Sequence, residues 1–135
     1  MSETIKLEIV TPEKMIYSGN VDMVTLPGIE GQMGVLPHHV RLMTQLIPGE
    51  LIINKGGRDS FFAVGEGLVE VTGERVAIVT NMAIPTEQIN EAAAEEARQR
   101  AAARLREKIS AEEVASVNAS LARSLAQLNV KRRRH

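Results

Sequence analysis

Few residues in this 135-residue chain combine a type and a spacing that could support catalysis. The absence of cysteine excludes thiolate metal sites, disulfides and cysteine nucleophiles. The histidines are His38, His39 and His135, and no pair of acidic residues stands near them at metal-ligand spacing. The chain has no phosphate-binding loop of the Walker type, and no serine or threonine has a histidine at a suggestive spacing. We therefore expect no catalytic residue, no bound metal and no obligatory cofactor.

Basic side chains are the remaining candidates, and they are concentrated near the C-terminus. Residues 1–85 carry six Lys/Arg and ten Asp/Glu, a charge of −4, whereas residues 86–135 carry ten and seven, a charge of +3. Such a division favours two parts with different partners. The only aromatic residues, Tyr17, Phe61 and Phe62, lie in the first part, so base stacking by the basic part is not expected.

Short apolar runs in the first part predict β-strands. Apolar residues alternate with others over 5–10 and over 21–26, and further runs lie at 51–53 and 61–64. Two runs, 68–71 and 76–79, flank Thr72-Gly73-Glu74-Arg75, which predicts a hairpin. The segment Gly65-Glu66-Gly67 follows a predicted strand, and no helix is predicted after it. It therefore indicates a bend in a sheet. Many short strands with frequent turns favour an aliphatic β-sandwich or a flattened barrel over residues 1–85.

The apolar period changes at Thr86, after which there is neither glycine nor proline. A first helix is predicted with Thr86 as its N-cap and one apolar stripe at spacing four, formed by Ile89, Ala93, Ala97, Ala101, Leu105 and Ile109. The capping-box pattern Ser110-Ala111-Glu112-Glu113 predicts a second helix from about residue 111. Its apolar stripe would be Val114, Val117, Leu121, Leu125 and Leu128, beside a shallower stripe of alanines.

An antiparallel hairpin is the natural arrangement of two helices joined with almost no linker. Its seam would be mostly alanine, and each buried methylene contributes only about 0.8 kcal/mol. One interpretation is a weakly held hairpin that opens or binds another surface. The other is that alanine permits close approach in a static hairpin, and the sequence leaves both open. The predicted fold class is α+β: an N-terminal ten-stranded β-sandwich in residues 1–85 and a C-terminal two-helix hairpin in residues 86–135.

Four segments of the chain resemble segments of a known family, and they occur in the same order: 8–13, 28–39, 64–71 and 121–130. The most specific is 28–39, which follows the family pattern G-x-E-G-E-h-G-h-h-P-x-H (h, apolar) with one change. Together they resemble the epsilon subunits of bacterial F-type ATP synthases over nearly the whole chain. The number of ten strands and the partners given below come from this resemblance.

The resemblance implies a rotor subunit at the foot of the central stalk, which couples proton-driven rotation to ATP synthesis. The β-domain would bind the gamma subunit and the c-ring, through Glu30, Gly31 and Gln32 and the nearby His39. Gln32 replaces the family's second acid, so a hydrogen bond stands where the family has a charge. The chain would lie at the cytoplasmic face of the bacterial plasma (inner) membrane, held there only by the complex, because no apolar run approaches the ~20 residues of a membrane span.

The family's helical domain inhibits ATP hydrolysis by extending into the catalytic head of alpha and beta subunits. The implied contacts with an acidic beta-subunit segment are Arg98, Arg100, Arg104, Arg106, Lys108 and Arg123. Arg100, Arg104 and Lys108 would share one helix face at spacing four. For any single arginine, pairing with a neighbouring glutamate is the plainer interpretation, whereas the collective charge favours an acidic partner.

Some members of the family bind ATP in the folded hairpin, and the corresponding positions are altered here. The motif resembles I/L-D-x-x-R-A, with two arginines four residues apart in the second helix. The matching residues are Ile89, Asn90 and Ala93, then Arg123 and Gln127, with Arg100 at a further basic position. Each lost charged hydrogen bond costs about 1.5–3 kcal/mol. We therefore predict weak or absent ATP binding.

The basic tail, Lys131 to Arg134, has three interpretations. It is favourable charge at a helix C-terminus, it enters an acidic interior of the catalytic head, or it binds nucleic acid or anionic lipid. The last would fit an alternative function, a free-standing β-sandwich adaptor with a nucleic-acid-binding helical tail. We expect the rotor function, with gamma, c-ring, alpha and beta as partners and no nucleic acid.

Overall fold

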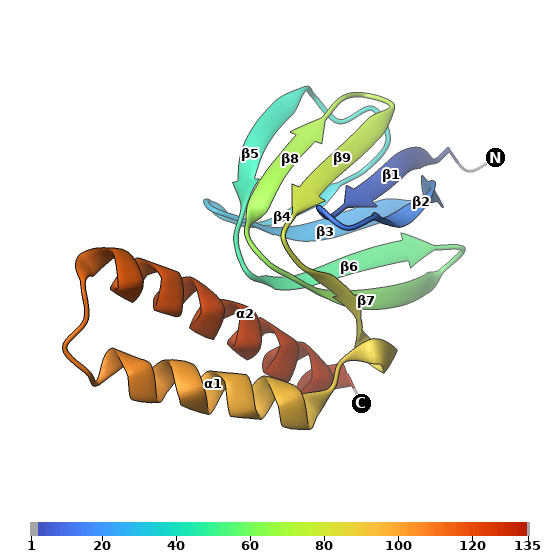
Figure 1. The fold of residues 1–135 in the computed structure, drawn as a ribbon. Coiled ribbons are helices and arrows are strands. Elements are labelled where there is room, and N and C mark those ends of the chain that lie inside the picture. Colours follow the sequence, from blue (N-terminus) through green and yellow to red (C-terminus); the bar gives the residue numbers. More distant parts are fainter. Residues whose placement is uncertain (1–2, 135) are drawn as a thin grey trace.

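Ten strands followed by two long helices make up the computed structural model, which describes residues 3–134 (Figure 1). Predictions that involve Met1, Ser2 or His135 lie outside the described residues. The strands are β1 (Ile5–Val10), β2 (Met15–Val21), β3 (Met23–Gly28), β4 (Gly31–Val35), β5 (Leu42–Leu46), β6 (Gly49–Lys55), β7 (Arg58–Val64), β8 (Gly67–Val71), β9 (Arg75–Thr80) and β10 (Ala83–Pro85). A short 3-10 turn, η1 (Thr86–Gln88), leads to α1 (Glu91–Leu105) and α2 (Ala111–Arg134). The predicted fold class is confirmed.

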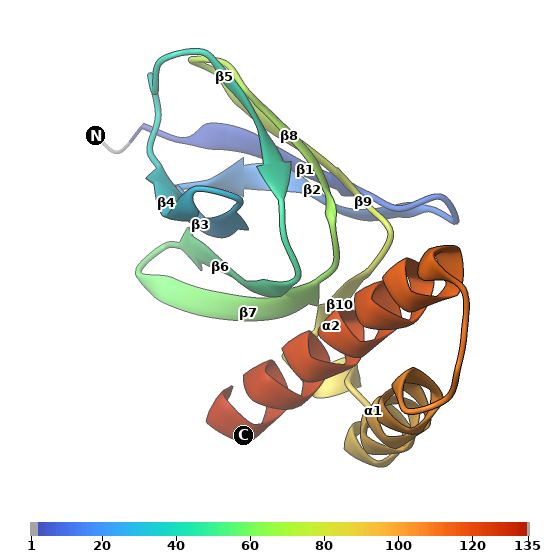
Figure 2. The same cartoon turned by 90° about the vertical axis from the view of Figure 1, so that its left-hand side faces the viewer.

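The strands form one hydrogen-bonded sheet that folds over on itself into two layers (Figures 1 and 2). Its order is β10-β7-β6-β3-β5-β8-β9-β1-β2, and β4 pairs with β3. β3 and β5 are joined only through the pair Gly28 and Leu46, and the sheet passes there from one layer to the other. All pairs are antiparallel except β1 with β9. The predicted hairpin is confirmed, because Val71 pairs with Val76 across the 72–75 turn.

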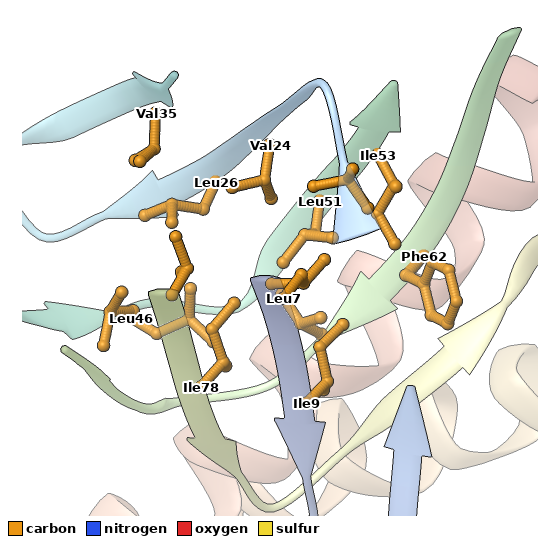
Figure 3. Close-up of a cluster of buried hydrophobic side chains, with 14 of the residues drawn as sticks. Leu7, Ile9, Val24, Leu26, Val35, Leu46, Leu51, Ile53, Phe62 and Ile78 are labelled. Atoms are coloured by element: carbon orange, nitrogen blue, oxygen red, sulfur yellow. The ribbon is translucent and has the colours of Figure 1, made fainter. Parts of the chain in front are cut away.

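The core lies between the two layers and is almost entirely aliphatic (Figure 3). Every second residue of a strand points inward, so β1 contributes Ile5, Leu7 and Ile9, none of which is exposed. Phe62 is the one aromatic residue among the core residues described, and its ring meets the Tyr17 ring edge-on at 6.3 Å. The low aromatic content of the sequence therefore predicted the chemistry of the core.

The predicted strand over 21–26 is divided in the structure. β2 ends at Val21 and β3 begins at Met23, because Asp22 turns the chain. The carboxylate of Asp22 accepts a 2.7 Å hydrogen bond from the backbone of Gly56. After this break the inward-facing residues are Val24 and Leu26.

Gly65-Glu66-Gly67 forms the bend that was predicted, between β7 and β8. Glycine is required at position 67, because a side chain there would collide with the carbonyl of Val79 on β9. The bend also brings Glu66 to the edge of the sandwich, where it meets α2.

The first helix begins later than predicted, and Thr86 does not cap it. Asn90 is the N-cap, since its side chain accepts from the Ala93 N–H at 3.0 Å. The Thr86 hydroxyl donates instead to the Phe61 carbonyl, 2.9 Å away. Ile89 therefore precedes the helix and Ile109 follows it, so the predicted stripe is wrong at both positions.

The second helix begins where the capping box predicted it. Ser110 Oγ accepts from the Glu113 N–H at 3.1 Å. Its buried residues are Ser124, Ala126, Leu128 and Val130, whereas Leu125 is 39% exposed. The predicted stripe is therefore wrong at Leu125, because the helix turns a different side toward the sheet. The linker between the helices, residues 106–110, is also longer than expected.

α2 is the helix that lies on the sandwich, and α1 lies beyond it (Figure 2). The C-terminal half of α2 crosses the outer face of β6 and β7, and α1 packs along α2. Any separation of the hairpin from the sandwich must therefore open the contact between α2 and the β6–β7 face.

Candidate interaction surfaces

The turn between β3 and β4 places Glu30, Gly31 and Gln32 at the surface, all three exposed. Gly31 adopts a φ of 125°, a backbone conformation that favours glycine. A cavity of about 290 Å³ adjoins the turn and is bordered by Met33 and Met43 among others. An acid and an amide on a protruding turn suit contact with a polar loop of another protein.

His39 lies in the loop that follows β4. β4 runs between the two positions, and the His39 ring hydrogen-bonds the Val40 carbonyl at 2.8 Å through Nδ1. The preceding residue, His38, has a φ of 67°, and its ring lies 3.0 Å from the Glu3 carboxylate. The expectation that His39 stands beside the 30–32 turn stays a prediction.

An apolar row crosses the outer face of the other layer, and reading the sequence alone missed it. Leu68 pairs with Val79, Val79 with Val10, and Val10 with Met15, on four neighbouring strands. We call these four residues the outer apolar row. Leu68, Val79 and Met15 are 56%, 57% and 49% exposed, and such a patch is typical of an interaction surface. The alternation in each strand was visible in the sequence, but the alignment of the four strands was not.

The contact between α2 and the sandwich has a small apolar centre. Val130 of α2 is buried against Ala63 of β7 and Ile89, and partly buried neighbours from β7 and the β10 region surround them. Beside this centre a cavity of about 330 Å³ separates Pro48, Gly49 and Glu50 from the α2 residues Ala122, Leu125, Ala126, Asn129, Val130 and Arg133. The helix is therefore only partly packed against the sheet.

Ionic contacts at the end of α2 supplement that packing. Arg134 holds the Glu50 carboxylate with two hydrogen bonds, Nε to Oε2 at 2.9 Å and Nη2 to Oε1 at 3.0 Å. Its guanidinium also lies 4.0 Å from the centre of the Phe61 ring. Arg133 reaches the same carboxylate at 3.4 Å. We call Glu50, Phe61, Arg133 and Arg134 the tail contact.

The other tail residues contact η1 and α1. Lys131 Nζ donates to the Thr86 carbonyl at 3.2 Å. Arg132 pairs with Glu91 at 3.0 Å and with Glu95 at 3.4 Å. The basic tail thus joins α2 to both the sheet and the first helix.

Arg123 makes a further ionic contact with the sandwich. It lies 3.3 Å from the carboxylate of Glu66, which also accepts from Asn81 at 2.7 Å. Partial burial raises the pKa of Glu66, but hydrogen bonds from its own backbone, Asn81 and Arg123 outweigh it, so that the pKa is lowered from 4.5. Arg123 was predicted to face a partner, and in this conformation it faces the sandwich.

The other predicted cations lie on α1 or in the linker. Arg98 hydrogen-bonds Glu95 with two nitrogens, at 2.6 and 3.1 Å, and this holds the pKa of Glu95 at about 2. Arg104 pairs with Glu107 and, at 2.6 Å, with Glu113 at the start of α2. These pairs match the plainer interpretation given above.

Arg100, Arg106 and Lys108 make no ion pair within the described part of the chain. The expectation that Arg100, Arg104 and Lys108 share one helix face is wrong for Lys108, because α1 ends at Leu105. Arg100 and Arg104 border a cavity of about 330 Å³ between the distal parts of the helices, opposite Ser116, Val117 and Ser120. The helices are therefore incompletely packed there, as the small seam residues suggested.

The positions of the altered ATP motif make different contacts in the docked chain. Ile89 is buried, Asn90 caps α1, and the exposed Ala93 supplies the capped N–H. Gln127 donates to the Met82 sulfur at 3.2 Å. Arg123 is already paired with Glu66.

Neither a metal site nor a membrane-spanning helix is found in residues 3–134. No group of three or more His, Cys, Asp or Glu there has the geometry to hold a metal ion. Within the same range, no helix is both long and apolar enough to cross a membrane.

Comparisons with known proteins match both parts of the chain. Residues 4–86 match the family model "ATP synthase, Delta/Epsilon chain, beta-sandwich domain", and residues 87–132 match "ATP synthase, Delta/Epsilon chain, long alpha-helix domain". The ATP synthase epsilon chain of Dehalococcoides mccartyi is 42% identical over 134 residues, which cover 97% of this chain and 96% of that one. The ATP synthase epsilon chain of Halorhodospira halophila is 40% identical over 127 residues, which cover 93% of this chain and 90% of that one.

Solved structures show the same fold within larger assemblies. A chain in the cryo-EM structure of the Euglena gracilis mitochondrial ATP synthase, described as OSCP/F1/c-ring, matches with a TM-score of 0.79 and 26% identity, covering 93% of this chain and 79% of that one. A chain in the central stalk/c-ring structure from Tetrahymena thermophila matches with a TM-score of 0.68 at 14% identity, covering 96% and 98%, a likeness of fold alone.

Proposed function

The chain belongs to the ATP synthase delta/epsilon family, and from that premise we propose how its two parts serve a rotor subunit. It is an epsilon-type subunit of the central stalk, and it is not the catalytic subunit of the complex. The observation that carries this function is that the models of both family domains match in order and together span residues 4–132. As a rotor subunit, it couples proton-driven rotation to ATP synthesis.

The sandwich, residues 1–85, is proposed to hold the chain between gamma and the c-ring. The exposed turn with Glu30, Gly31 and Gln32 would meet polar loops of the c-ring. The outer apolar row would pack on gamma, because three exposed apolar side chains in line with the half-buried Val10 need an apolar partner surface. His39 lies in a different loop from the turn and is proposed only as a secondary contact. The complex would hold the chain at the cytoplasmic face of the bacterial plasma membrane.

The helices, residues 86–135, are proposed to inhibit ATP hydrolysis when they leave the sandwich and extend into the catalytic head. Two features support a detachable hairpin: α2 has a small apolar contact with the sheet, and a cavity lies beside that contact. Once extended, Arg98, Arg100, Arg104, Arg106, Lys108 and Arg123 would face an acidic segment of beta. The pairs of Arg98, Arg104 and Arg123 with glutamates would have to be exchanged for pairs with beta.

ATP binding to the hairpin is proposed to be weak or absent. The acid and one arginine of the motif are replaced by Asn90 and Ala93, and Gln127 stands at the position of another arginine. Micromolar binding in a calorimetric titration of the full chain would contradict this.

The alternative function, nucleic-acid binding, was suggested by the basic tail, Lys131 to Arg134. In the structure this tail contacts Glu50, Glu91, Glu95 and the Thr86 carbonyl, so it does not favour that alternative. Retention on DNA at moderate salt, without co-purification of a gamma subunit, would restore that alternative.

The deciding experiment is removal of the helices from the assembled complex. Deletion of residues 86–135 should raise ATP hydrolysis and leave proton coupling in place, because the sandwich alone would keep its contacts with gamma and the c-ring. A complex with the intact chain is the control. Unchanged hydrolysis would refute the inhibitory function, and loss of the subunit from the complex would show that the helices also anchor it.

A further inference from the structure

We propose that Glu50 of β6 is the residue that retains the docked hairpin, through its contact with Arg133 and Arg134 at the end of α2. Loss of this ionic contact then lowers the proportion of chains with a docked hairpin. The proposal rests on the proposed function, since it names the residues that would regulate release of the inhibitory helices.

Glu50 occupies an unusual place for a carboxylate. It lies on the outer face of β6, directly opposite Ala63 of β7, while its neighbour Leu51 points into the core. Its side chain is only 11% exposed when α2 is docked. A carboxylate so far removed from water must be paired, because an unpaired buried charge is strongly unfavourable.

The charge is paired entirely by the last turn of α2 as far as the described contacts show. Arg134 supplies a two-pronged contact at 2.9 and 3.0 Å, and Arg133 adds a third approach at 3.4 Å. Such a paired geometry is the strongest arrangement of an arginine and a carboxylate. The Phe61 ring also packs against the face of the Arg134 guanidinium and helps to hold the arginine in place.

The remainder of the interface is small, and its polar contacts include the Arg123–Glu66 pair and the hydrogen bond from Lys131 to the Thr86 carbonyl. The buried centre consists of Val130, Ala63 and Ile89, and the adjoining cavity of about 330 Å³ leaves Ala122 and Leu125 poorly covered. When α2 leaves, water solvates Glu50 and both arginines again. The ion pairs and the small apolar centre stabilise the docked state. Hydration of the separated charges and the greater conformational freedom of the hairpin stabilise the undocked state, so docking requires that the first two contributions exceed the last two.

A distance measurement on the full chain tests the proposal without reference to enzyme activity. The chain has no cysteine, so Lys55→Cys on β6 and Ser116→Cys on α2 would be the only sites for a pair of spin labels. Both positions are exposed. The unsubstituted tail should give one dominant, narrowly distributed distance for the docked hairpin, and release of the hairpin should replace it with a broad distribution. A label pair that shows no docked population would overturn the proposal.

Removal of either partner should release the hairpin. Arg134→Ala and Glu50→Ala should each lower the docked-to-undocked ratio about tenfold, the size expected for loss of a charged hydrogen-bonded pair. The two changes combined should lower the ratio by much less than the product of the single effects, because both remove the same contact. Glu50→Gln, which keeps the size of the side chain, should lower the ratio less than Glu50→Ala.

Arg106→Ala is the matched control, since it removes one arginine charge from the linker between the helices. It should leave the ratio unchanged. Equal ratios for Arg134→Ala and Arg106→Ala, or fully multiplicative effects in the double variant, would overturn the proposal. Thermal unfolding of the sandwich should be the same in all variants, which separates undocking from misfolding.

The two possible failures can be told apart. If the Glu50 and Arg134 variants keep the hairpin docked but deletion of residues 86–135 still raises hydrolysis, the retention by Glu50 is wrong and the inhibitory function stands. If those variants undock the hairpin but deletion has no effect on hydrolysis, the Glu50 contact stands and the inhibitory function is wrong.

Discussion

Two of the packed interfaces of this molecule, one between the sheet layers and one between α2 and the sheet, differ in kind. Between the sheet layers, aliphatic side chains such as Leu7, Leu26 and Ile78 are wholly removed from water and each strand is hydrogen-bonded to its neighbours. Between α2 and the sheet, a few apolar side chains share the surface with a cavity and with arginine–glutamate pairs. The first interface gives a rigid body, and the second is the contact that we propose to be exchanged for another when the hairpin is released.

The largest expected effect comes from truncating the sandwich core. Ile78→Ala should lower the free energy of unfolding by about 2–5 kcal/mol, because it empties space in a fully buried site. Urea unfolding followed by circular dichroism measures this. Val79→Ala, on the exposed side of the same strand, is the control and should change stability little.

A smaller effect is expected from truncation at the helix contact. Val130→Ala should weaken docking of α2 by about 2 kcal/mol, because Val130 is buried against Ala63 and Ile89. The docked fraction measured by the spin labels should fall, while urea unfolding of the sandwich stays as in the parent. A simultaneous loss of sandwich stability would show that the two interfaces are not independent.

Filling the cavity beside the tail contact should act in the opposite direction. Ala122→Leu places extra methylenes toward the space bordered by Pro48 and Gly49, and should strengthen docking by about 1 kcal/mol. The docked fraction measured by the labels should rise. A fall would mean that the cavity cannot accommodate the larger side chain.

The smallest effect concerns pH at Glu66. Its pKa is lowered from 4.5 in the docked chain, so its contribution is complete above about pH 4.5 and is lost as the pH falls through the lowered pKa. Because the side chain is 41% exposed, the contribution should be about 0.5 kcal/mol or less. A titration of the docked fraction from pH 6 to pH 3 checks this.

Arg123→Ala provides the control for that titration. Without the arginine, the acid-induced loss of docking should be smaller, because one of the groups that lowers the Glu66 pKa is gone. An identical titration in parent and variant would assign the acid sensitivity to other carboxylates.

Local patterns in the sequence predicted most of the architecture. Alternation marked the strands, the 72–75 turn marked a hairpin, and Ser110 marked the start of α2. The start of α1 was predicted wrongly, because Thr86 and Asn90 are both acceptable N-caps. The Phe61 carbonyl on β7 engages the Thr86 hydroxyl, and that long-range bond leaves the cap to Asn90.

The sequence by itself determined the period of each segment, the aliphatic chemistry of the core and the lack of a recognisable catalytic group, since these depend on residue type and near neighbours. Only the tertiary structure decided that Arg134 meets Glu50, that Arg123 meets Glu66, and that the outer apolar row lines up. Arg134 and Glu50 are 84 residues apart along the chain, and Arg123 and Glu66 are 57 apart. Their meeting depends on strand order and helix placement, and free energy summed over the whole fold sets both.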